Sequence, residues 1–345
     1  MFSGSTFKLL NSFTDKSTNN EEKTPATLES SFVFFDLNLS LEQKYTLTSL
    51  KISKNNEFEN SDNFENIVTD IEKFISALDS ENATISIKIA QLIFEIIKAV
   101  ISEMHQETAW IVMRASQPND LFKYPRWHTD GCYFPPHQGE QFKVVVTLAG
   151  PGTLFYNLPD TQREAFNLLD NDRAKTLKML QGIKPETPAA GQGAVFIAGS
   201  QTRAAVHSEP HINSPRLFLA IAPCSRSQLN CRFESQKEFQ RKLMSDPAFL
   251  KQIEELKKRA FSAPSVAELT ETNGVLTQDK EERTAAKPLE QKSGSSLRSY
   301  SLYSIEPRFD SNNNTRSTMA ESSGFNSVDT PALQRSSCMS LSFRR

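Results

Sequence analysis

The sequence predicts a mainly β fold with flanking helices, an antiparallel sandwich or jelly roll. Seven short apolar runs follow one another between residues 108 and 223, and turns rich in Gly and Pro separate them, as in Gly150-Pro151-Gly152. Apolar residues at helical spacing precede these runs. Short strands separated by such turns are typical of sandwiches and jelly rolls.

The strands should form one core domain, residues 108–223. We expect strands at 110–115, 126–131, 142–149, 153–158, 194–199, 204–207 and 216–222, with a helical insert at 160–181. A C-terminal helical section, residues 224–261, should follow the core and cover one sheet face, with its helix starting near residue 234. The core therefore carries its helices as appendages rather than as alternating crossovers.

An N-terminal helical part, residues 32–107, should pack on this core. It begins with a short strand at 32–37 and a helix at 41–50, and the polar stretch 51–63 reads as a loop. Two helices follow, at 64–78 and 84–105, because isoleucines and phenylalanines recur there every three or four positions.

Both ends of the chain predict disorder. Residues 1–31 and 262–345 are rich in Ser, Thr, Asn and charged residues and have no sustained apolar pattern. The C-terminal segment is of a kind that serves as a translocation signal in secreted bacterial effectors, and a dispensable tail is the alternative. Unchanged localisation after deletion of 262–345 would remove the effector hypothesis.

Composition excludes several classes of protein. The net charge is −2 among 345 residues, and no basic block appears, so we expect no general nucleic-acid binding. The apolar stretch 85–101 carries Lys88, Glu95 and Lys98, which argues against a membrane span. The four cysteines are too sparse for a disulfide framework, and the first residues lack a secretory signal. These features favour a cytoplasmic protein.

The candidate functional residues are a His and an Asp two positions apart, His128 and Asp130, and a second His far downstream, His207. In a strand, His128 and Asp130 point to the same face. His207 ends a later strand, and a jelly roll brings early and late strands together. Two imidazoles and one carboxylate on one face form the ligand set that holds non-haem Fe(II).

Arg216 adds a second signal at the start of the last strand. It shares one face with Phe218 and small residues, whereas Leu217, Leu219 and Ile221 share the other face. The aliphatic face should pack against helices. The Arg216 face leaves room for a ligand, and a guanidinium there suits a planar carboxylate.

In this order, His128, Asp130, His207 and Arg216 resemble the motif of the Fe(II)/2-oxoglutarate-dependent dioxygenase superfamily, in which HxD precedes a distal His and then an Arg or Lys. The resemblance covers roughly residues 108–223. The stretches 148–153 and 193–196 also look like a little-characterised bacterial branch of that superfamily.

The resemblance implies an oxidoreductase with a double-stranded β-helix core that hydroxylates, or oxidatively demethylates, an unidentified substrate. Fe(II) would be held by the first three residues, 2-oxoglutarate would be the cosubstrate bound by Arg216, and dioxygen would be consumed. Tyr156 or Thr153 would add a hydrogen bond to the cosubstrate. Tyr133 or His137 would contact the substrate.

Two alternatives remain open at this point. The chain is a non-catalytic jelly-roll binding module, or it is a cupin-like metalloenzyme that does not use 2-oxoglutarate and whose Arg216 binds a substrate carboxylate directly. Neither the substrate nor the oligomeric state follows from the sequence.

Overall fold

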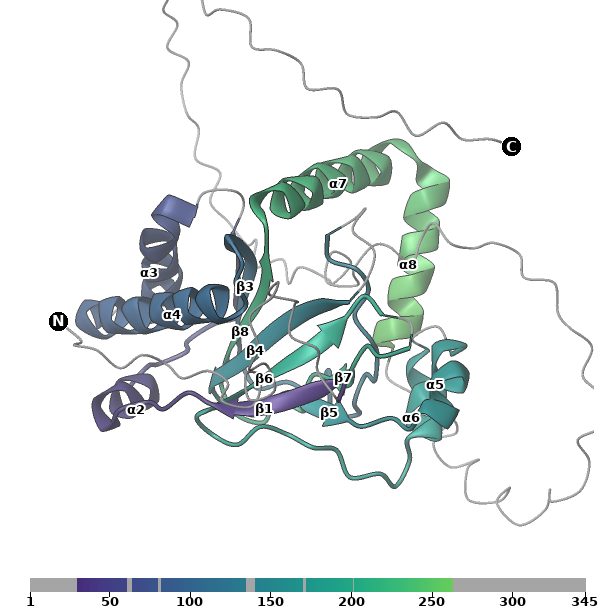
Figure 1. Ribbon diagram of the computed structural model, residues 1–345, viewed down its shortest axis with the longest axis horizontal. Helices are drawn as coiled ribbons and strands as arrows, with labels where there is room; N and C mark the ends of the chain where they lie inside the picture. The colour runs from purple at the N-terminus through teal and green to yellow at the C-terminus, as the bar shows by residue number, and fades with distance from the viewer. Residues whose placement is uncertain are drawn as a thin grey trace, which may run out of the picture. The chain divides into compact units, whose positions relative to one another are not determined.

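A six-stranded antiparallel sheet lies at the centre of the fold (Figure 1). The computed structural model describes residues 30–60, 64–79, 82–134, 140–169, 172–200 and 202–262, all within the first of two units, Met1–Phe309. In spatial order the strands are β1 (Phe32–Asp36), β6 (Gln192–Ala198), β4 (Gln141–Ala149), β8 (Arg216–Cys224), β3 (Thr108–Ser116) and β2 (Asn56–Glu59).

A second, smaller sheet faces the inner side of the large one. β5 (Leu154–Tyr156) pairs with β7 (Val206–Ser208), and isolated bridges add one segment at each edge, His128 to His207 and Glu186 to Phe155. The smaller sheet therefore contains four chain segments.

The pairing of these segments is nested. β3 pairs with β8, the His128 segment with β7, β4 with β6, and β5 with the Glu186 segment. The first segment pairs with the last and each inner pair closes within the one outside it, which is the connectivity of a jelly roll. The predicted fold class is thus confirmed.

The helices that the structure describes lie around the two sheets (Figure 1). They are α2 (Leu41–Thr48), α3 (Ile67–Leu78), α4 (Ala83–Glu103), α5 (Asp160–Asn167), α6 (Arg173–Met179), α7 (Arg226–Ser245) and α8 (Pro247–Phe261), and a 3₁₀ turn, η1 (Phe64–Asn66), leads into α3.

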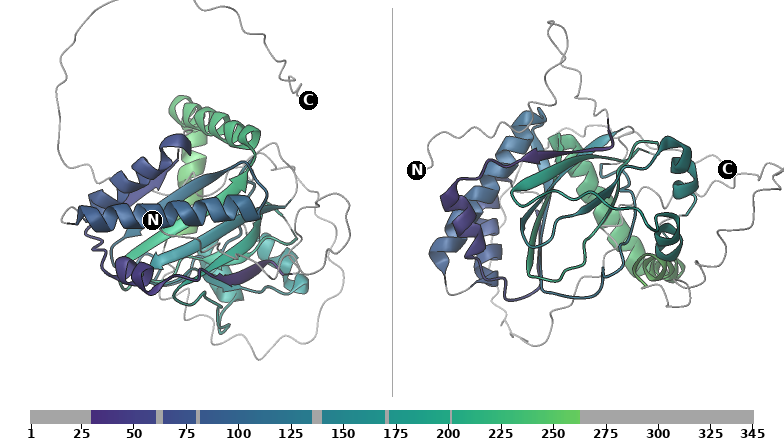
Figure 2. Two further views of the ribbon diagram at one scale, coloured as in Figure 1. Left: turned by 60° about the vertical axis from the view of Figure 1, so that its left-hand side comes forward. Right: turned by 90° about the horizontal axis from the view of Figure 1, so that it is seen from below.

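The outer face of the large sheet packs against α3 and α4 (Figures 1 and 2). Leu217, Leu219 and Ile221 of β8 are fully buried in one cluster with the isoleucines of these helices. Burial of a large aliphatic side chain stabilises the fold by about 1.5–3 kcal/mol. The alternation predicted for β8 is therefore confirmed on its aliphatic side.

The inner face of the large sheet forms a separate core with the small sheet. From β8 it receives Phe218, Ala220 and Ala222, together with Phe155 of β5 and Phe196 of β6. The outer side of the small sheet is covered by α5 and α6 through a third apolar cluster. The small sheet therefore lies between the inner core and the α5–α6 pair.

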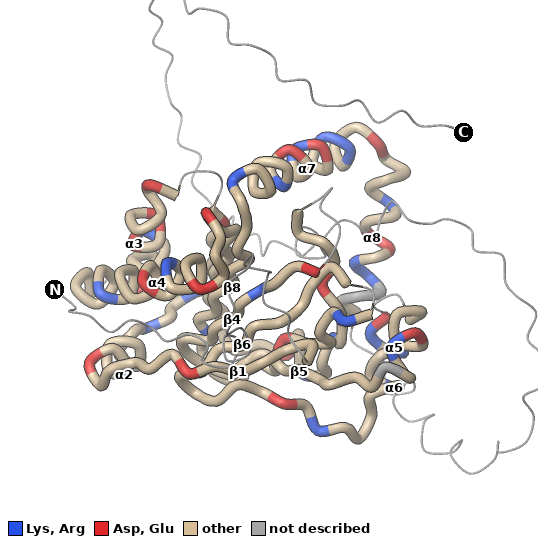
Figure 3. Tube along the Cα trace, in the orientation of Figure 1, with Lys and Arg blue, Asp and Glu red and all other residues tan. Residues whose placement is uncertain are grey.

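The C-terminal section differs from the single helical segment expected to cover one sheet face. It contains two helices, α7 and α8, and α7 begins at Arg226, after the N-cap Ser225, rather than near residue 234. α7 inserts Leu229 into the inner core, and α8 packs on α7 and α6. Along α7, positive and negative side chains alternate (Figure 3) and form intrahelical ion pairs such as Lys237–Glu234, as a solvated helix does.

Two further sequence expectations need correction. The expected loop 51–63 contains strand β2, which pairs with β3 although Phe58 is its only apolar residue. The expected strand 126–131 makes a single bridge, at His128. The expected helical insert at 160–181 is present and contains the helices α5 and α6.

The expected disordered ends, 1–31 and 262–345, lie outside the described residues except at 30–31 and 262. Among the helices that the structure describes, none combines the length and the apolar character needed to cross a bilayer.

Candidate metal centre

His128, Asp130 and His207 converge inside the jelly roll, between the two sheets. His128 and His207 face each other across the small sheet, where each backbone N–H donates to the other's carbonyl at 3.0 Å. The exposed fractions are 0% for His128, 4% for Asp130 and 2% for His207. Folding thus brings His207 beside His128 and Asp130, although 77 positions separate it from Asp130 in the sequence.

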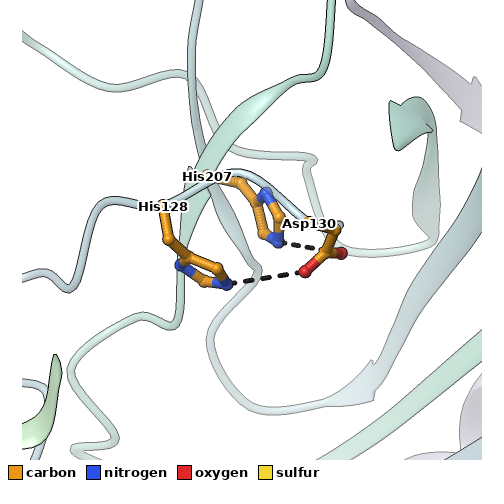
Figure 4. A group of neighbouring side chains, drawn as sticks. All are labelled: His128, Asp130 and His207. Carbon is orange, nitrogen blue, oxygen red and sulfur yellow. Dashed lines mark ion pairs between the residues drawn. The ribbon is translucent and has the colours of Figure 1, made fainter. Parts of the chain in front are cut away.

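The three side chains point toward one another (Figure 4). Nε2 of His128 lies 3.7 Å from Oδ1 of Asp130, and Nε2 of His207 lies 3.4 Å from Oδ2. One ligand atom from each residue can be chosen so that all lie within 4.8 Å of one another. This spacing suits three ligands on one side of a metal ion.

The other ring nitrogens fix the orientation of both imidazoles. Nδ1 of His128 lies 2.8 Å from the carbonyl of Arg126, and Nδ1 of His207 lies 3.1 Å from the carbonyl of Ala205. Since a carbonyl only accepts, each Nδ1 carries the proton and donates it. Nε2 is then the basic nitrogen, as in histidines that bind metals.

The atoms directed into the trio have no hydrogen-bond partner. Nε2 of His128, Nε2 of His207 and Oδ1 of Asp130 are all buried and unsatisfied. Buried polar atoms are nearly always paired, and an unmade bond costs about 1–3 kcal/mol. Three such atoms converging on one point fit a bound cation.

The protonation states also suit a cation. Burial, followed by the charges of Arg126 and His207, lowers the pKa of His128 to about 3, and burial lowers the pKa of His207. Burial alone would raise the pKa of Asp130, but Lys143 and the two imidazoles outweigh it, so this pKa lies below its usual range. At neutral pH the trio therefore offers two neutral imidazoles and a carboxylate.

Two neighbours hold the second oxygen of Asp130. Tyr133 donates its hydroxyl to Oδ2, and Nζ of Lys143 lies 3.1 Å from the same atom. Tyr133 was predicted as a substrate contact, whereas here it contacts a candidate ligand. Lys143 was missed, although a Lys at an inward-facing position of an apolar run is a readable signal.

A buried ion pair adjoins the two histidines. Arg126 stands two residues before His128, and Glu209 stands two residues after His207, so the pair bridges the same two segments. Nη2 of Arg126 lies 2.6 Å from Oε1 of Glu209. Sequence reasoning missed this pair because only strand pairing places the residues opposite each other.

Arg216 lies at the start of β8, on the inner face, and is 4% exposed. Its Nε donates to the carbonyl of Pro151 at 2.9 Å, its Nη2 donates to Oγ1 of Thr153 at 3.2 Å, and its guanidinium lies 4.5 Å from the ring centroid of Phe218. These contacts orient the guanidinium from the turn between β4 and β5. Thr153, predicted beside the cosubstrate, is thus a neighbour of Arg216.

The remaining predicted residues lie elsewhere. Tyr156 packs against Trp127 in the cluster on the outer side of the small sheet, whereas Phe155 beside it faces His207. His137 lies outside the described residues. A pocket of about 310 Å³ borders the turn that holds Arg216, and its lining includes Pro151, Leu154 and Gln192 but none of the trio.

Sequence comparison gives no relative. No protein-family model matches the chain, and no curated protein matches it.

Solved structures give weak likenesses. A viral collagen prolyl hydroxylase from Paramecium bursaria Chlorella virus-1 is 12% identical, with a TM-score of 0.28, over 60% of this chain and 96% of that one. A prolyl-4-hydroxylase from Pseudomonas putida is 11% identical, with a TM-score of 0.28, over 57% and 94%. A prolyl hydroxylase from Trichoplax adhaerens, in complex with a hypoxia inducible factor peptide, is 8% identical, with a TM-score of 0.30, over 59% and 86%. TM-scores this low do not support a fold assignment. The assignment as a jelly roll therefore rests on the strand pairing described above.

Proposed function

We propose that the protein is an Fe(II)- and 2-oxoglutarate-dependent dioxygenase. One observation carries the proposal: three buried, unsatisfied ligand atoms of His128, Asp130 and His207 converge inside a jelly roll. Two imidazoles and one carboxylate on one face are the donor set of non-haem Fe(II) oxygenases. The ion they hold would supply open positions for a 2-oxo acid and for dioxygen.

Arg216 is the proposed anchor for the far carboxylate of the cosubstrate. Its guanidinium is buried on the inner face of the large sheet, and Thr153 and the Pro151 carbonyl orient it. A buried guanidinium binds a carboxylate through charge-assisted, often bidentate, hydrogen bonds. A dicarboxylate that reaches from the metal to this strand end would have both of its charged ends bound.

Small side chains in the inner core support this arrangement. Ala220 and Ala222 of β8 and Ala194 of β6 belong to the cluster that also contains Phe155 and Phe196, the two rings that pack against His207. The apolar walls keep water from the reacting centre, while Asp130 and the histidines fix its position. In the proposed reaction a substrate C–H, 2-oxoglutarate and dioxygen give an alcohol, succinate and carbon dioxide.

Turnover of the cosubstrate tests the proposal. Purified protein supplied with Fe(II), dioxygen and 2-oxoglutarate should release succinate, and His128→Ala should abolish the release. Arg216→Gln should raise the KM for 2-oxoglutarate at least tenfold, since the lost carboxylate contact is worth about 1.5–3 kcal/mol.

The control outcomes separate the alternatives. Metal binding without any succinate release or stabilisation by 2-oxoglutarate would favour a metalloenzyme of another kind. No metal binding at all would leave a binding module.

A further inference from the structure

Lys143 is a buried ammonium inside the jelly roll, in contact with a candidate metal ligand. It lies on β4 with an exposed fraction of 1%, and its neighbours Val144 and Val146 face the helices instead. Its Nζ lies 3.1 Å from Oδ2 of Asp130. Burying an ammonium costs several kcal/mol unless its attraction to a counter-ion offsets that cost. Asp130 is therefore the counter-ion that lets Lys143 stay inside.

Two aromatic rings lie near the ammonium. Nζ lies 5.1 Å from the ring centroid of Tyr133 and 5.6 Å from that of Phe196. A cation near an aromatic face gains a further favourable interaction, largest where water is excluded. The Lys143 ammonium thus lies close to Asp130 and to two aromatic rings.

The two oxygens of Asp130 have different roles in this arrangement. Oδ2 accepts from the Tyr133 hydroxyl, pairs with Lys143 and lies 3.4 Å from Nε2 of His207. Oδ1 has no hydrogen-bond partner and lies 3.7 Å from Nε2 of His128. A cation held by the trio would bind Oδ1. One carboxylate would then serve two cations.

We propose that Lys143 is the counter-ion of Asp130 in the metal-free protein and that its charge lowers the affinity of the trio for a divalent cation. The inference rests on the proposed function only in placing a metal ion at the trio. A divalent ion and an ammonium that share one carboxylate repel each other, and the low dielectric of the interior strengthens this repulsion. The same ammonium keeps Asp130 paired when no metal is bound.

Removing the charge should therefore have two opposite effects. Lys143→Met should destabilise the metal-free protein, because Asp130 becomes a buried carboxylate without a counter-ion. The same change should tighten metal binding at least tenfold. A tenfold change corresponds to about 1.4 kcal/mol, a small part of the repulsion between a divalent and a monovalent cation a few ångström apart.

Tyr133→Phe is the matched control. It removes the other donor to Oδ2 without changing any charge. If a residue merely positions Asp130, its loss should weaken metal binding, because mutating the neighbours of metal ligands usually lowers the affinity for the metal. We expect Tyr133→Phe to leave the affinity within about threefold of the wild type or to weaken it, so the two substitutions differ in sign.

The experiment compares the full-length wild type with both variants. Mn(II) and Zn(II) binding is measured by calorimetric titration, and thermal unfolding is followed in the presence of a chelator. Lys143→Met should bind both ions at least tenfold more tightly than the wild type, and its Tm in chelator should fall by about 4 °C or more. Lys143→Gln carries the same prediction and replaces Lys143→Met if that variant does not fold.

The outcomes are distinguishable. If the wild type binds metal and Lys143→Met or Lys143→Gln binds it no more tightly, this inference is overturned and the proposed function is not. Unchanged stability in chelator also overturns this inference. Failure of the wild type to bind either ion overturns the proposed function together with this inference.

Discussion

The ion pair between Arg126 and Glu209 is the interaction beside the candidate metal centre whose loss we expect to cost the most stability. Nη2 of Arg126 lies 2.6 Å from Oε1 of Glu209, and the side chains are 1% and 12% exposed. At an effective dielectric constant of about 20, two unit charges at this separation attract by about 6 kcal/mol. Removing one partner of a buried pair costs about 3–5 kcal/mol. Because Gln keeps a hydrogen-bond acceptor, we expect Glu209→Gln to lower the free energy of unfolding by about 3 kcal/mol.

Urea denaturation followed by circular dichroism measures this change, and Glu140→Gln is the control. Glu140 also pairs with an arginine, Arg203, at 3.0 Å, but these side chains are 28% and 38% exposed. Exposed pairs contribute about 0–1 kcal/mol. In an Arg126→Met background, Glu209→Gln should cost less than about 1 kcal/mol, because no buried guanidinium is left uncompensated. A cost for Glu209→Gln in the wild type no larger than that of Glu140→Gln would refute the reasoning.

The pH dependence of stability gives the same prediction a second readout. Burial alone would raise the pKa of Glu209, but the charge of Arg126 and then that of His128 outweigh it, so the pKa lies well below the ordinary 4.5. Since the folded-state pKa is the lower one, the ionised carboxylate contributes its full stability above about pH 4.5 and loses it as pH falls through the folded-state pKa. The difference between wild type and Glu209→Gln should therefore shrink in acid.

Two further predictions test the turn at Arg216 and the thiols. Gly150 has a φ of +81°, and an added Cβ would lie 2.6 Å from the carbonyl of Pro215 and 2.9 Å from Cα of Arg216, whereas Gly191 has a φ of +83° and open space around it. Gly150→Ala should therefore weaken 2-oxoglutarate binding and cost more stability than Gly191→Ala, which bears only the backbone strain of about 1–2 kcal/mol; equal effects would contradict the steric account. Burial raises the pKa of Cys224 to about 12, whereas Cys231 is exposed, so iodoacetamide followed by peptide mass spectrometry should label Cys231 first and Cys224 only after unfolding.

The parts of the fold that were predictable are those with a local pattern. The alternation of large aliphatic and other side chains along β8, and the helical spacing of apolar residues in α3 and α4, are patterns within a short stretch of sequence. Each of these elements forms where expected. β2 was missed because its pairing with β3 decides it, and a four-residue edge strand with one apolar side chain carries little pattern of its own.

The candidate site shows the same division. The convergence of His128, Asp130 and His207 was predicted because a jelly roll pairs early strands with late ones, and the motif order agreed with it. Tyr133 and Lys143 were not placed beside Asp130, because the Tyr133 contact depends on a loop and the Lys143 contact depends on β4, which belongs to the large sheet. Such contacts between segments follow from the tertiary packing and not from any local spacing.

The most direct test of the central claim is anaerobic spectroscopy of the protein with Fe(II). Addition of 2-oxoglutarate should produce a weak visible absorption band in the green region, because a 2-oxo acid chelated to Fe(II) accepts charge from the metal. We expect the band in the wild type, its loss in His207→Ala, and its appearance only at higher 2-oxoglutarate concentration in Arg216→Gln. A wild type that binds Fe(II) but gives no band at saturating 2-oxoglutarate would contradict the proposed cosubstrate.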